Sequence, residues 1–334
     1  MSFKHVLVTG ANGFVGRHLC RTLVESGRDV TICVRADMDA SIFADLSGSL
    51  KVWRLPAMGF EGDLNEFPWG VDAVIHLAGR AHVMRETAVD PLAEFRKANV
   101  MGLANIASVA LLRGVNRFIF LSSIKVNGES TTDRAFKADD LPGYCDPYGQ
   151  SKWEAEERLR RIATGTSMEW VIVRPPLVYG PHVRGNFLQL MKSAAHGIPL
   201  PLGGVHNRRS LVSVYNLSEF LSQIVDHPGA SNSRFLVSDA EDMSTPELIR
   251  RMAAAMHRPS RVLPCPESIL RLSGTLLGQK AKIQRLCSSL VLDKHKTTEM
   301  LGWTAQRSVD WGLERTAEWF LKHETGKNRR VQSD

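Results

Sequence analysis

Tyr148 and Lys152 stand four positions apart in a segment with a helical pattern, and this spacing allows acid–base chemistry. Residues four apart project from one face of a helix, so an ammonium can lie close to the phenol. A tyrosine titrates near a pKa of about 10 by itself, and a neighbouring cation favours its phenolate. We therefore predict that Tyr148 is a general acid or base, although the same spacing also occurs by chance.

A pair of serines follows the apolar run Phe118–Leu121. In open parallel sheets ligands bind at the carboxyl ends of the strands, where Ser123 is expected to lie. Its hydroxyl could hydrogen-bond a substrate oxygen while Tyr148 handles the proton. The alternative is that both serines simply end a strand.

A glycine-rich turn lies near the amino terminus, after the apolar run Val6–Thr9. Glycines at a strand-to-helix turn let the backbone approach a pyrophosphate, which the helix N-terminus attracts. Their spacing is three and three, not the two and three of the commonest fingerprint, and a purely structural turn remains the alternative. The predicted cofactor-binding residues of this turn are Gly10, Asn12, Gly13, Phe14, Val15 and Gly16.

Arg35 follows the second apolar run, where an acidic residue would usually receive the adenosine ribose hydroxyls. A guanidinium there suits a 2′-phosphate, so NADP(H) is favoured as the cofactor and NAD(H) remains open. The alternative is that Arg35 is a solvated loop residue.

Short apolar strands alternate with helical patterns, which predicts an α/β fold: a Rossmann-type doubly wound parallel sheet with a smaller C-terminal substrate lobe. Asp146-Pro147 is a helix start, and Glu154, Glu156 and Glu157 are expected to keep the outer face of that helix polar. The expected strands are His5–Thr9, Asp29–Val34, Lys51–Arg54, Ala73–Leu77, Arg117–Ser122 and Trp170–Arg174, with further helices at about Gly13–Ser26 and Phe95–Leu112.

Two units are predicted along the chain of 334 residues. Residues 1–174 would form the dinucleotide-binding domain and residues 175–334 the substrate lobe, with segments near 205–237 returning to the first domain. Leu211–Val214 and Phe235–Val237 both have the pattern of buried strands. The Leu-rich amphipathic stretch Ile269–Leu292 could pack on the lobe or contact a membrane surface.

Composition excludes several classes of protein. The net charge of +7 comes from basic residues that we interpret as spread along the chain, so we predict no nucleic-acid partner. The five cysteines lack the paired spacing of metal sites, so no metal is predicted. No apolar run is long enough to span a bilayer and no secretory signal is visible, so we expect no stable membrane insertion and a cytoplasmic enzyme.

The glycine turn, Ser123, Tyr148 and Lys152 together resemble the extended short-chain dehydrogenase/reductase family, in particular its nucleotide-sugar epimerase, dehydratase and reductase branch. This resemblance covers nearly the whole chain and implies a homodimer acting on a UDP-sugar. It assigns adenine contact to Asp63 and Leu64 and places further residues beside the cofactor: Leu77, Ala78, Gly79, Asn99, Tyr148, Lys152, Pro175 and Val178. For the substrate it implies Arg80, Asn186 and Arg209, and it matches Leu301-Gly302-Trp303 to a carboxyl-terminal signature.

Lys125 and Asn127 replace the Thr and Tyr that the epimerase pattern usually has, and Arg35 replaces its acidic ribose ligand. The chain therefore looks most similar to reductases of UDP-4-keto-6-deoxy-N-acetylhexosamines, with Lys125 contacting the substrate or lying exposed in a loop. The expected reaction is NADPH-dependent reduction of UDP-2-acetamido-2,6-dideoxy-hexos-4-ulose for surface polysaccharide. The alternatives are a UDP-sugar 4-epimerase and a catalytically inactive NAD(P)-binding regulator.

Overall fold

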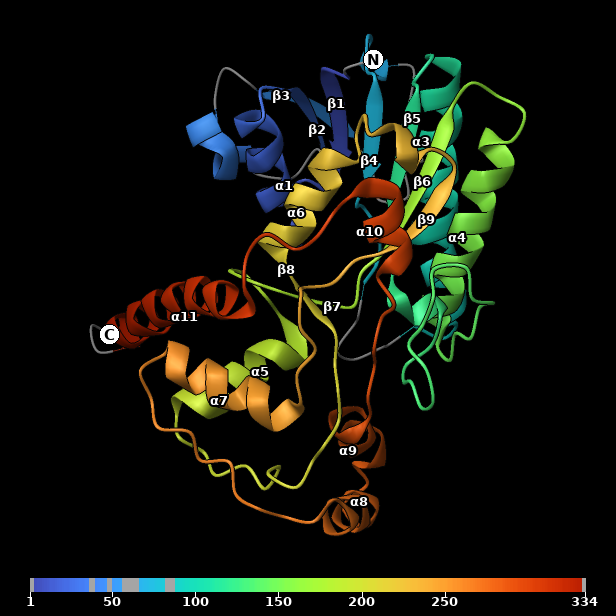
Figure 1. Ribbon diagram of the computed structural model, residues 1–334. Helices are drawn as coiled ribbons and strands as arrows, with labels where there is room; N and C mark the ends of the chain where they lie inside the picture. Colours follow the sequence, from blue (N-terminus) through green and yellow to red (C-terminus); the bar gives the residue numbers. More distant parts are fainter. Residues whose placement is uncertain (1–2, 36–39, 47–49, 56–65, 82–87, 332–334) are drawn as a thin grey trace.

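The computed structural model describes residues 3–35, 40–46, 50–55, 66–81 and 88–331. Its centre is a seven-stranded parallel sheet in the order β3-β2-β1-β4-β5-β6-β9 (Figure 1). The chain leaves β1 toward β3 on one side and returns to build β4, β5, β6 and β9 on the other, so the order reverses between β1 and β4. The strands are β1 His5–Thr9, β2 Asp29–Arg35, β3 Leu50–Leu55, β4 Ala73–His76, β5 Arg117–Leu121, β6 Glu169–Arg174 and β9 Ser233–Leu236.

Helices cover both faces of this sheet and bury its central strands on both sides, whereas the edge strand β3 is partly exposed. Val6 and Val8 of β1 pack with α1 and α6, whereas Leu7 between them packs with α3 and α4. This alternation is the period of two of an extended chain. The predicted doubly wound α/β fold is therefore confirmed. The helices concerned are α1 Phe14–Glu25, α3 Gly102–Leu112, α4 Pro147–Ala163 and α6 Val214–Gln223.

The helix expected at Phe95–Leu112 differs from the prediction. A short helix, α2 (Pro91–Phe95), is capped by the Asp90 side chain and is followed by a π-helical turn, Arg96–Met101, before α3 begins. Such turns contain an extra residue and are frequent at functional sites. Here the turn contains Asn99, whose side chain is buried.

A second apolar core lies beyond the sheet in the lower part of Figure 1 and contains residues of α5, α7 and α11. Leu211–Ser213 forms β8 and pairs with β7 in a separate two-stranded sheet, whereas Ser233–Leu236 joins the main sheet beside β6. Both stretches are buried strands, but burial alone does not determine which neighbour a strand pairs with. The remaining elements are β7 Leu177–Tyr179, α5 Gly185–Ala195, α7 Thr245–Ala255, α8 Glu267–Leu276, α9 Lys280–Cys287, α10 His295–Leu301 and α11 Val309–Val331.

The Leu-rich stretch forms two helices, not one. Gly278, with a positive φ of 65°, separates α8 from α9, and the chain after α9 runs extended beside Phe136 through Leu292. Leu290 and Leu292 are buried in a small core. Most leucines of α8, in contrast, are exposed.

Candidate active site

Two glycines have no room for a side chain: Gly10 in the turn between β1 and α1, and Gly16 in the first turn of α1. Gly10 has a φ of +68°, and a Cβ there would lie 2.7 Å from the Ala78 amide nitrogen. A Cβ on Gly16 would lie 2.4 Å from the Gly10 carbonyl oxygen. The absence of both Cβ atoms brings the turn, the start of α1 and the chain after β4 into direct backbone contact.

The amino end of α1 is suited to bind an anion. Gly13 is its N-cap; among the described residues no side chain caps this helix, and no acidic residue lies in its first turn. The partial positive charge of this end therefore faces the turn without compensation. Arg17 donates from Nε to the Asn12 carbonyl at 2.9 Å and holds the turn closed. These residues fit the pyrophosphate of a dinucleotide.

Phe14 and Val15 complete the predicted turn and face different cores. Phe14 packs against the core of the second lobe, and Val15 packs against the core beneath α1. The first turn of α1 is thus fixed on two sides.

The segment that follows β4 lies beside the glycine turn and leads toward α4. Ala78 donates its backbone N–H to the Thr9 hydroxyl at 3.3 Å, and the Leu77 N–H is bonded to the Thr9 carbonyl at 3.2 Å. Thr9 also contacts Nδ1 of buried His76 at 2.9 Å, and burial lowers the pKa of His76 to about 3. The imidazole is therefore neutral at physiological pH.

Asn99 joins this segment to α4. Its side-chain oxygen accepts the Arg80 N–H at 2.7 Å, and its Nδ2 donates to the Arg80 carbonyl and, at 2.9 Å, to Ser151 of α4. A Cβ on Gly79 would lie 2.7 Å from the Asn99 oxygen and 3.6 Å from the Lys152 Nζ. The predicted cofactor residues Gly79 and Asn99 therefore lie beside Lys152.

Asp146 and Pro147 position Tyr148. The Asp146 carboxylate accepts the Gly149 N–H at 2.7 Å, and Pro147 occupies the first turn of α4. Tyr148 follows and hydrogen-bonds Ser123, the residue two positions after β5 ends. Burial raises the pKa of Tyr148 to about 12, and the Ser123 contact opposes that rise. Tyr148 is thus a protonated phenol in contact with a hydroxyl.

Lys152 lies one turn further along the same face of α4. Its Nζ donates to the Leu121 carbonyl at 3.0 Å and lies 4.6 Å from the Phe120 ring centre and 5.9 Å from the Tyr148 ring centre. Burial lowers the pKa of Lys152 to about 8, and the Glu156 carboxylate opposes that fall. The ammonium therefore remains largely charged at neutral pH.

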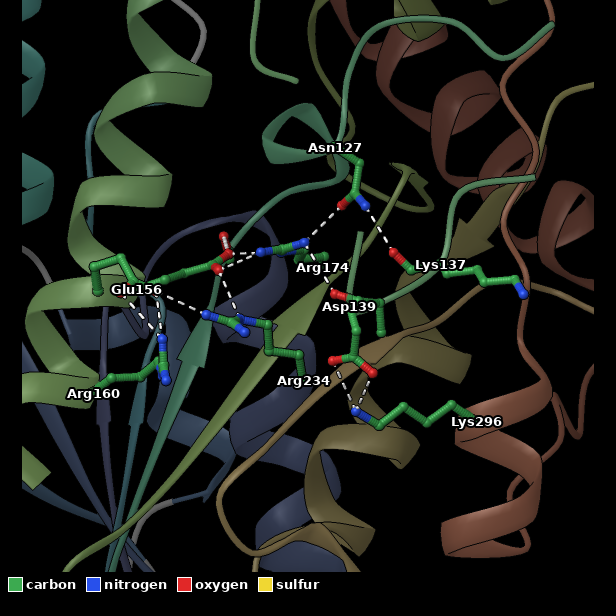
Figure 2. Close-up of polar contacts among 11 residues, drawn as sticks. Asn127, Lys137, Asp139, Glu156, Arg160, Arg174, Arg234 and Lys296 are labelled. Carbon is green, nitrogen blue, oxygen red and sulfur yellow. Dashed lines mark hydrogen bonds and ion pairs between the residues drawn. The ribbon is translucent and has the colours of Figure 1, made fainter. Parts of the chain in front are cut away.

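Glu156 lies a further turn along, at the centre of a buried polar network (Figure 2). It accepts two hydrogen bonds from Arg174, at 2.9 and 2.6 Å, and one from Ser122, at 2.5 Å. Arg174 also donates to the side-chain oxygen of Asn127 at 2.9 Å. The network thus fixes Ser122, the neighbour of Ser123, to the helix that carries Tyr148 and Lys152.

The prediction that Glu156 keeps the outer face of α4 polar is therefore wrong. Glu156 is fully buried, and its spacing of four from Lys152 and eight from Tyr148 places it on the same inward face. That spacing is the signal in the sequence that could have identified it.

Other predicted cofactor residues lie at different distances from this cluster. The Pro175 carbonyl accepts the Ile124 N–H at 3.0 Å, which places it beside Ser123, and Val178 packs against the core beneath α1. Arg35 ends β2 and is exposed. Asp63 and Leu64 fall outside the described residues.

Of the predicted substrate residues, Lys125 lies beside Ser123, whose hydroxyl accepts the Lys125 N–H at 3.3 Å. Arg80 forms an ion pair with Glu94 at 3.5 Å, and Lys125 forms ion pairs with Glu129, at 2.7 Å, and Asp146. Asn186 is exposed near the start of α5. Arg209 donates to the carbonyls of Arg285, in the last turn of α9, and Ser288, its C-cap.

A family model described as the NAD dependent epimerase/dehydratase family matches residues 6–237, which include the glycine turn, Ser123, Tyr148 and Lys152. The chain belongs to this family. Among curated relatives, UDP-glucose 4-epimerase of Vibrio cholerae is 41% identical over 96% of each chain. N-acetyl-α-D-glucosaminyl-diphospho-ditrans,octacis-undecaprenol 4-epimerase of Escherichia coli O157:H7 is 26% identical, also over 96% of each.

Solved structures share the fold. MoeE5 in complex with UDP-glucose and NAD superposes with a TM-score of 0.75 at 24% identity, covering 96% of this chain and 99% of that one. UDP-glucuronic acid 4-epimerase from Bacillus cereus in complex with NAD gives a TM-score of 0.77 at 19% identity, covering 95% and 99%. As a member of the NAD-dependent epimerase/dehydratase family, the protein is an enzyme of nucleotide-sugar chemistry.

The described residues contain neither a membrane-spanning helix nor a metal-binding cluster. No described helix combines the length and the apolar character needed to cross a bilayer. Within the same residues, no cluster of three or more His, Cys, Asp or Glu side chains could hold a metal ion.

Proposed function

We propose that this family member reduces the 4-keto group of a UDP-linked sugar with a nicotinamide cofactor. The observation that carries this proposal is the hydrogen bond between Tyr148 and Ser123 just after the carboxyl end of β5; burial, which raises the pKa of Tyr148 to about 12, keeps this phenol protonated. Reduction of a ketone needs a proton donor at its oxygen, whereas oxidation of an alcohol begins with a base. A protonated Tyr148 can supply that proton, which supports the proposed direction.

In this mechanism Ser123 hydrogen-bonds the ketone oxygen and Tyr148 delivers a proton to it. The reduced nicotinamide, when bound, supplies the hydride that reaches C4. The Lys152 ammonium, held by the Leu121 carbonyl, stabilises the negative charge left on the tyrosine oxygen. General acid assistance of this kind contributes roughly 10² to 10⁴-fold in rate.

The proposed cofactor is NADP(H), with NAD(H) as the alternative. Arg35 is exposed at the carboxyl end of β2, the position from which a guanidinium can receive a 2′-phosphate. An Arg35→Ser variant should bind NADPH at least about tenfold more weakly, with little change for NADH. Equal losses for both cofactors would contradict a phosphate contact.

The proposed substrate is UDP-2-acetamido-2,6-dideoxy-hexos-4-ulose, in surface polysaccharide synthesis. Its UDP group is supported by the 41% identical Vibrio cholerae relative, and its acetamido group by the name of the Escherichia coli relative. Residues 1–174, with β9, would hold the cofactor and residues 175–334 the sugar nucleotide. Arg80, Lys125, Asn186 and Arg209 are its proposed contacts. Arg80, Lys125 and Arg209 would exchange the partners described above for the substrate.

A second candidate is a UDP-sugar 4-epimerase, which the Vibrio cholerae relative favours. Lys125 and Asn127 depart from the epimerase pattern. The Lys125 ammonium forms an ion pair with Asp146, and the Asn127 side-chain oxygen accepts a hydrogen bond from Arg174. They therefore leave Ser123, Tyr148 and Lys152 unchanged. In an epimerase these three groups would move the proton, and a tightly held nicotinamide would accept the hydride and return it.

One experiment separates these candidates. The purified protein is incubated with UDP-sugars and their 4-keto derivatives, with NADPH or NADH, and products are identified by mass spectrometry and by configuration at C4. Steady loss of absorbance of the reduced cofactor supports the reductase. An interconversion of C4 epimers without that loss supports the epimerase, and cofactor binding without turnover supports an inactive regulator.

The proposed assembly is a homodimer in the cytoplasm. Sedimentation equilibrium of the purified protein tests the first point, and fractionation of the producing cells tests the second.

A further inference from the structure

Four large apolar side chains of the α8 segment are exposed to solvent. Ile269, Leu272 and Leu276 follow a spacing of three and four along α8, so they share one face, and Leu277 continues it. Their exposed fractions are 56, 62, 77 and 72%. Single exposed leucines are ordinary, but a continuous group of them on one helix face marks an interaction surface.

The opposite face of α8 is fixed to the protein. Leu270 and Gly274 are buried, and a Cβ on Gly274 would lie 2.6 Å from the Cγ1 of Ile283 in α9. Two isolated bridges, Leu200 with Val262 and Gly204 with Pro266, hold the chain that leads into α8. The exposed leucines therefore stand on a supported helix.

The positive charge of the protein concentrates in the same segment. Residues 258–285 contain six basic residues and one acidic residue, a net charge of +5 in a chain whose total is +7. The acidic residue, Glu267, forms an ion pair with Arg271 at 2.6 Å, and Lys280 and Arg285 are exposed on α9. This distribution differs from our interpretation that the basic residues are spread along the chain.

Figure 1 shows where this surface lies. The helices α8 and α9 form the end of the lobe farthest from the seven-stranded sheet. A broad planar partner can therefore reach them at the end of the molecule opposite the sheet. We name this surface the α8 patch: Ile269, Leu272, Leu276 and Leu277 with Arg271, Lys280 and Arg285.

We propose that the α8 patch docks the protein on a membrane surface that contains anionic lipids. Leucines beside cations are the composition of interfacial helices, which bury an apolar face at the headgroup boundary while their cations meet lipid phosphates. This docking is peripheral and crosses no bilayer. It is independent of the reaction proposed above.

The chemistry of the α8 patch disfavours two other occupants. A second copy of the chain in a symmetric dimer would place the same patch on both sides, opposing two net charges of +5. A nucleic acid would use aromatic side chains for stacking, and residues 258–285 contain no Phe, Trp or Tyr.

The test is sedimentation of the full chain with vesicles of phosphatidylcholine and with vesicles that also contain phosphatidylglycerol. We expect sedimentation with the anionic vesicles, reduced by added salt. The double variant Leu272→Ser/Leu276→Ser should bind about a hundredfold more weakly, at about tenfold for each leucine removed from the bilayer. In Lys280→Gln and Arg285→Gln, each lost cation should weaken binding about fivefold.

Leu112→Ser is the matched control, because Leu112 is 83% exposed on α3, outside the α8 patch. Thermal unfolding of each variant confirms that the fold is retained. The proposal is overturned if the wild-type protein remains in the supernatant with anionic vesicles, or if the double variant sediments as well as the control. It is also overturned if the double variant instead loses a self-association that the wild type shows in sedimentation velocity without lipid.

Discussion

Replacing Glu156 by Gln should lower the pH at which the enzyme loses activity. Burial holds the pKa of Lys152 at about 8, and Glu156 is the carboxylate that opposes a further fall. Lys152 is charged below its pKa, so wild-type kcat/KM should decline as pH rises through about 8. Without the Glu156 charge, the same decline should begin at lower pH.

The size of the pKa change follows from the spacing of Lys152 and Glu156 on α4. Side chains four residues apart lie about 6 Å from each other, and two charges at that separation interact by about 3 kcal/mol at an effective dielectric constant of about 20. This energy corresponds to about two pKa units. Loss of Glu156 also leaves Arg174 and Arg234 without the carboxylate that they share. Their uncompensated positive charges would lower the pKa of Lys152 further.

The assay is the pH profile of kcat/KM, which reports groups of the free enzyme. Removing one partner of a buried ion pair costs about 3–5 kcal/mol, so urea unfolding must first show that Glu156→Gln is folded. Glu156→Asp retains the charge and should restore most of the profile. Glu157→Gln is the control, because Glu157 pairs with Arg160 and Arg234 and not with Ser122.

A folded Glu156→Gln enzyme whose alkaline decline stays near the wild-type pH would refute this reasoning. An equal displacement in Glu157→Gln would do the same, because the effect would then not be specific to the inward face of α4.

Three further predictions concern the site and its support. Tyr148→Phe should bind cofactor normally in a fluorescence titration and lose roughly 10² to 10⁴-fold in turnover; an unchanged rate would remove Tyr148 from the mechanism. Gly16→Ala should destabilise the protein by about 1–3 kcal/mol in urea and weaken cofactor binding, because the new Cβ meets the Gly10 carbonyl. Trp303→Ala should cost about 3–5 kcal/mol in urea, since Trp303 is buried with its ring 4.9 Å from that of Phe220; a loss below about 1 kcal/mol would show that the carboxyl-terminal segment does not stabilise the main core.

Local chemistry explains which elements the sequence could predict. The run His5–Thr9 is apolar because β1 is covered on both faces, and its limits agree with the prediction. Asp146 and Pro147 begin α4 because the carboxylate caps an N–H and proline needs none there. Where one residue type satisfies one local requirement, the sequence is sufficient.

Other features depend on contacts between distant segments. The pattern of Leu211–Ser213 indicates burial, but its pairing with β7 and not the main sheet is set by the path of the whole chain. The π-helical turn that presents Asn99 has no simple periodicity. Glu156 was predicted to face solvent because carboxylates usually do, and its buried partner, Arg174, lies on another element.

The basic segment 258–285 is a further feature that the sequence pattern did not reveal. Counted along the chain, the basic residues are numerous throughout, and only the excess over acidic residues distinguishes 258–285 from the rest. Structure adds that the leucines between those cations face solvent, whereas the neighbouring Leu270 is buried. An amphipathic pattern predicts that one face is apolar, but it does not say whether that face meets the protein. For α8 the buried face is narrow and the exposed apolar face is wide, so packing within the lobe explains only part of its sequence.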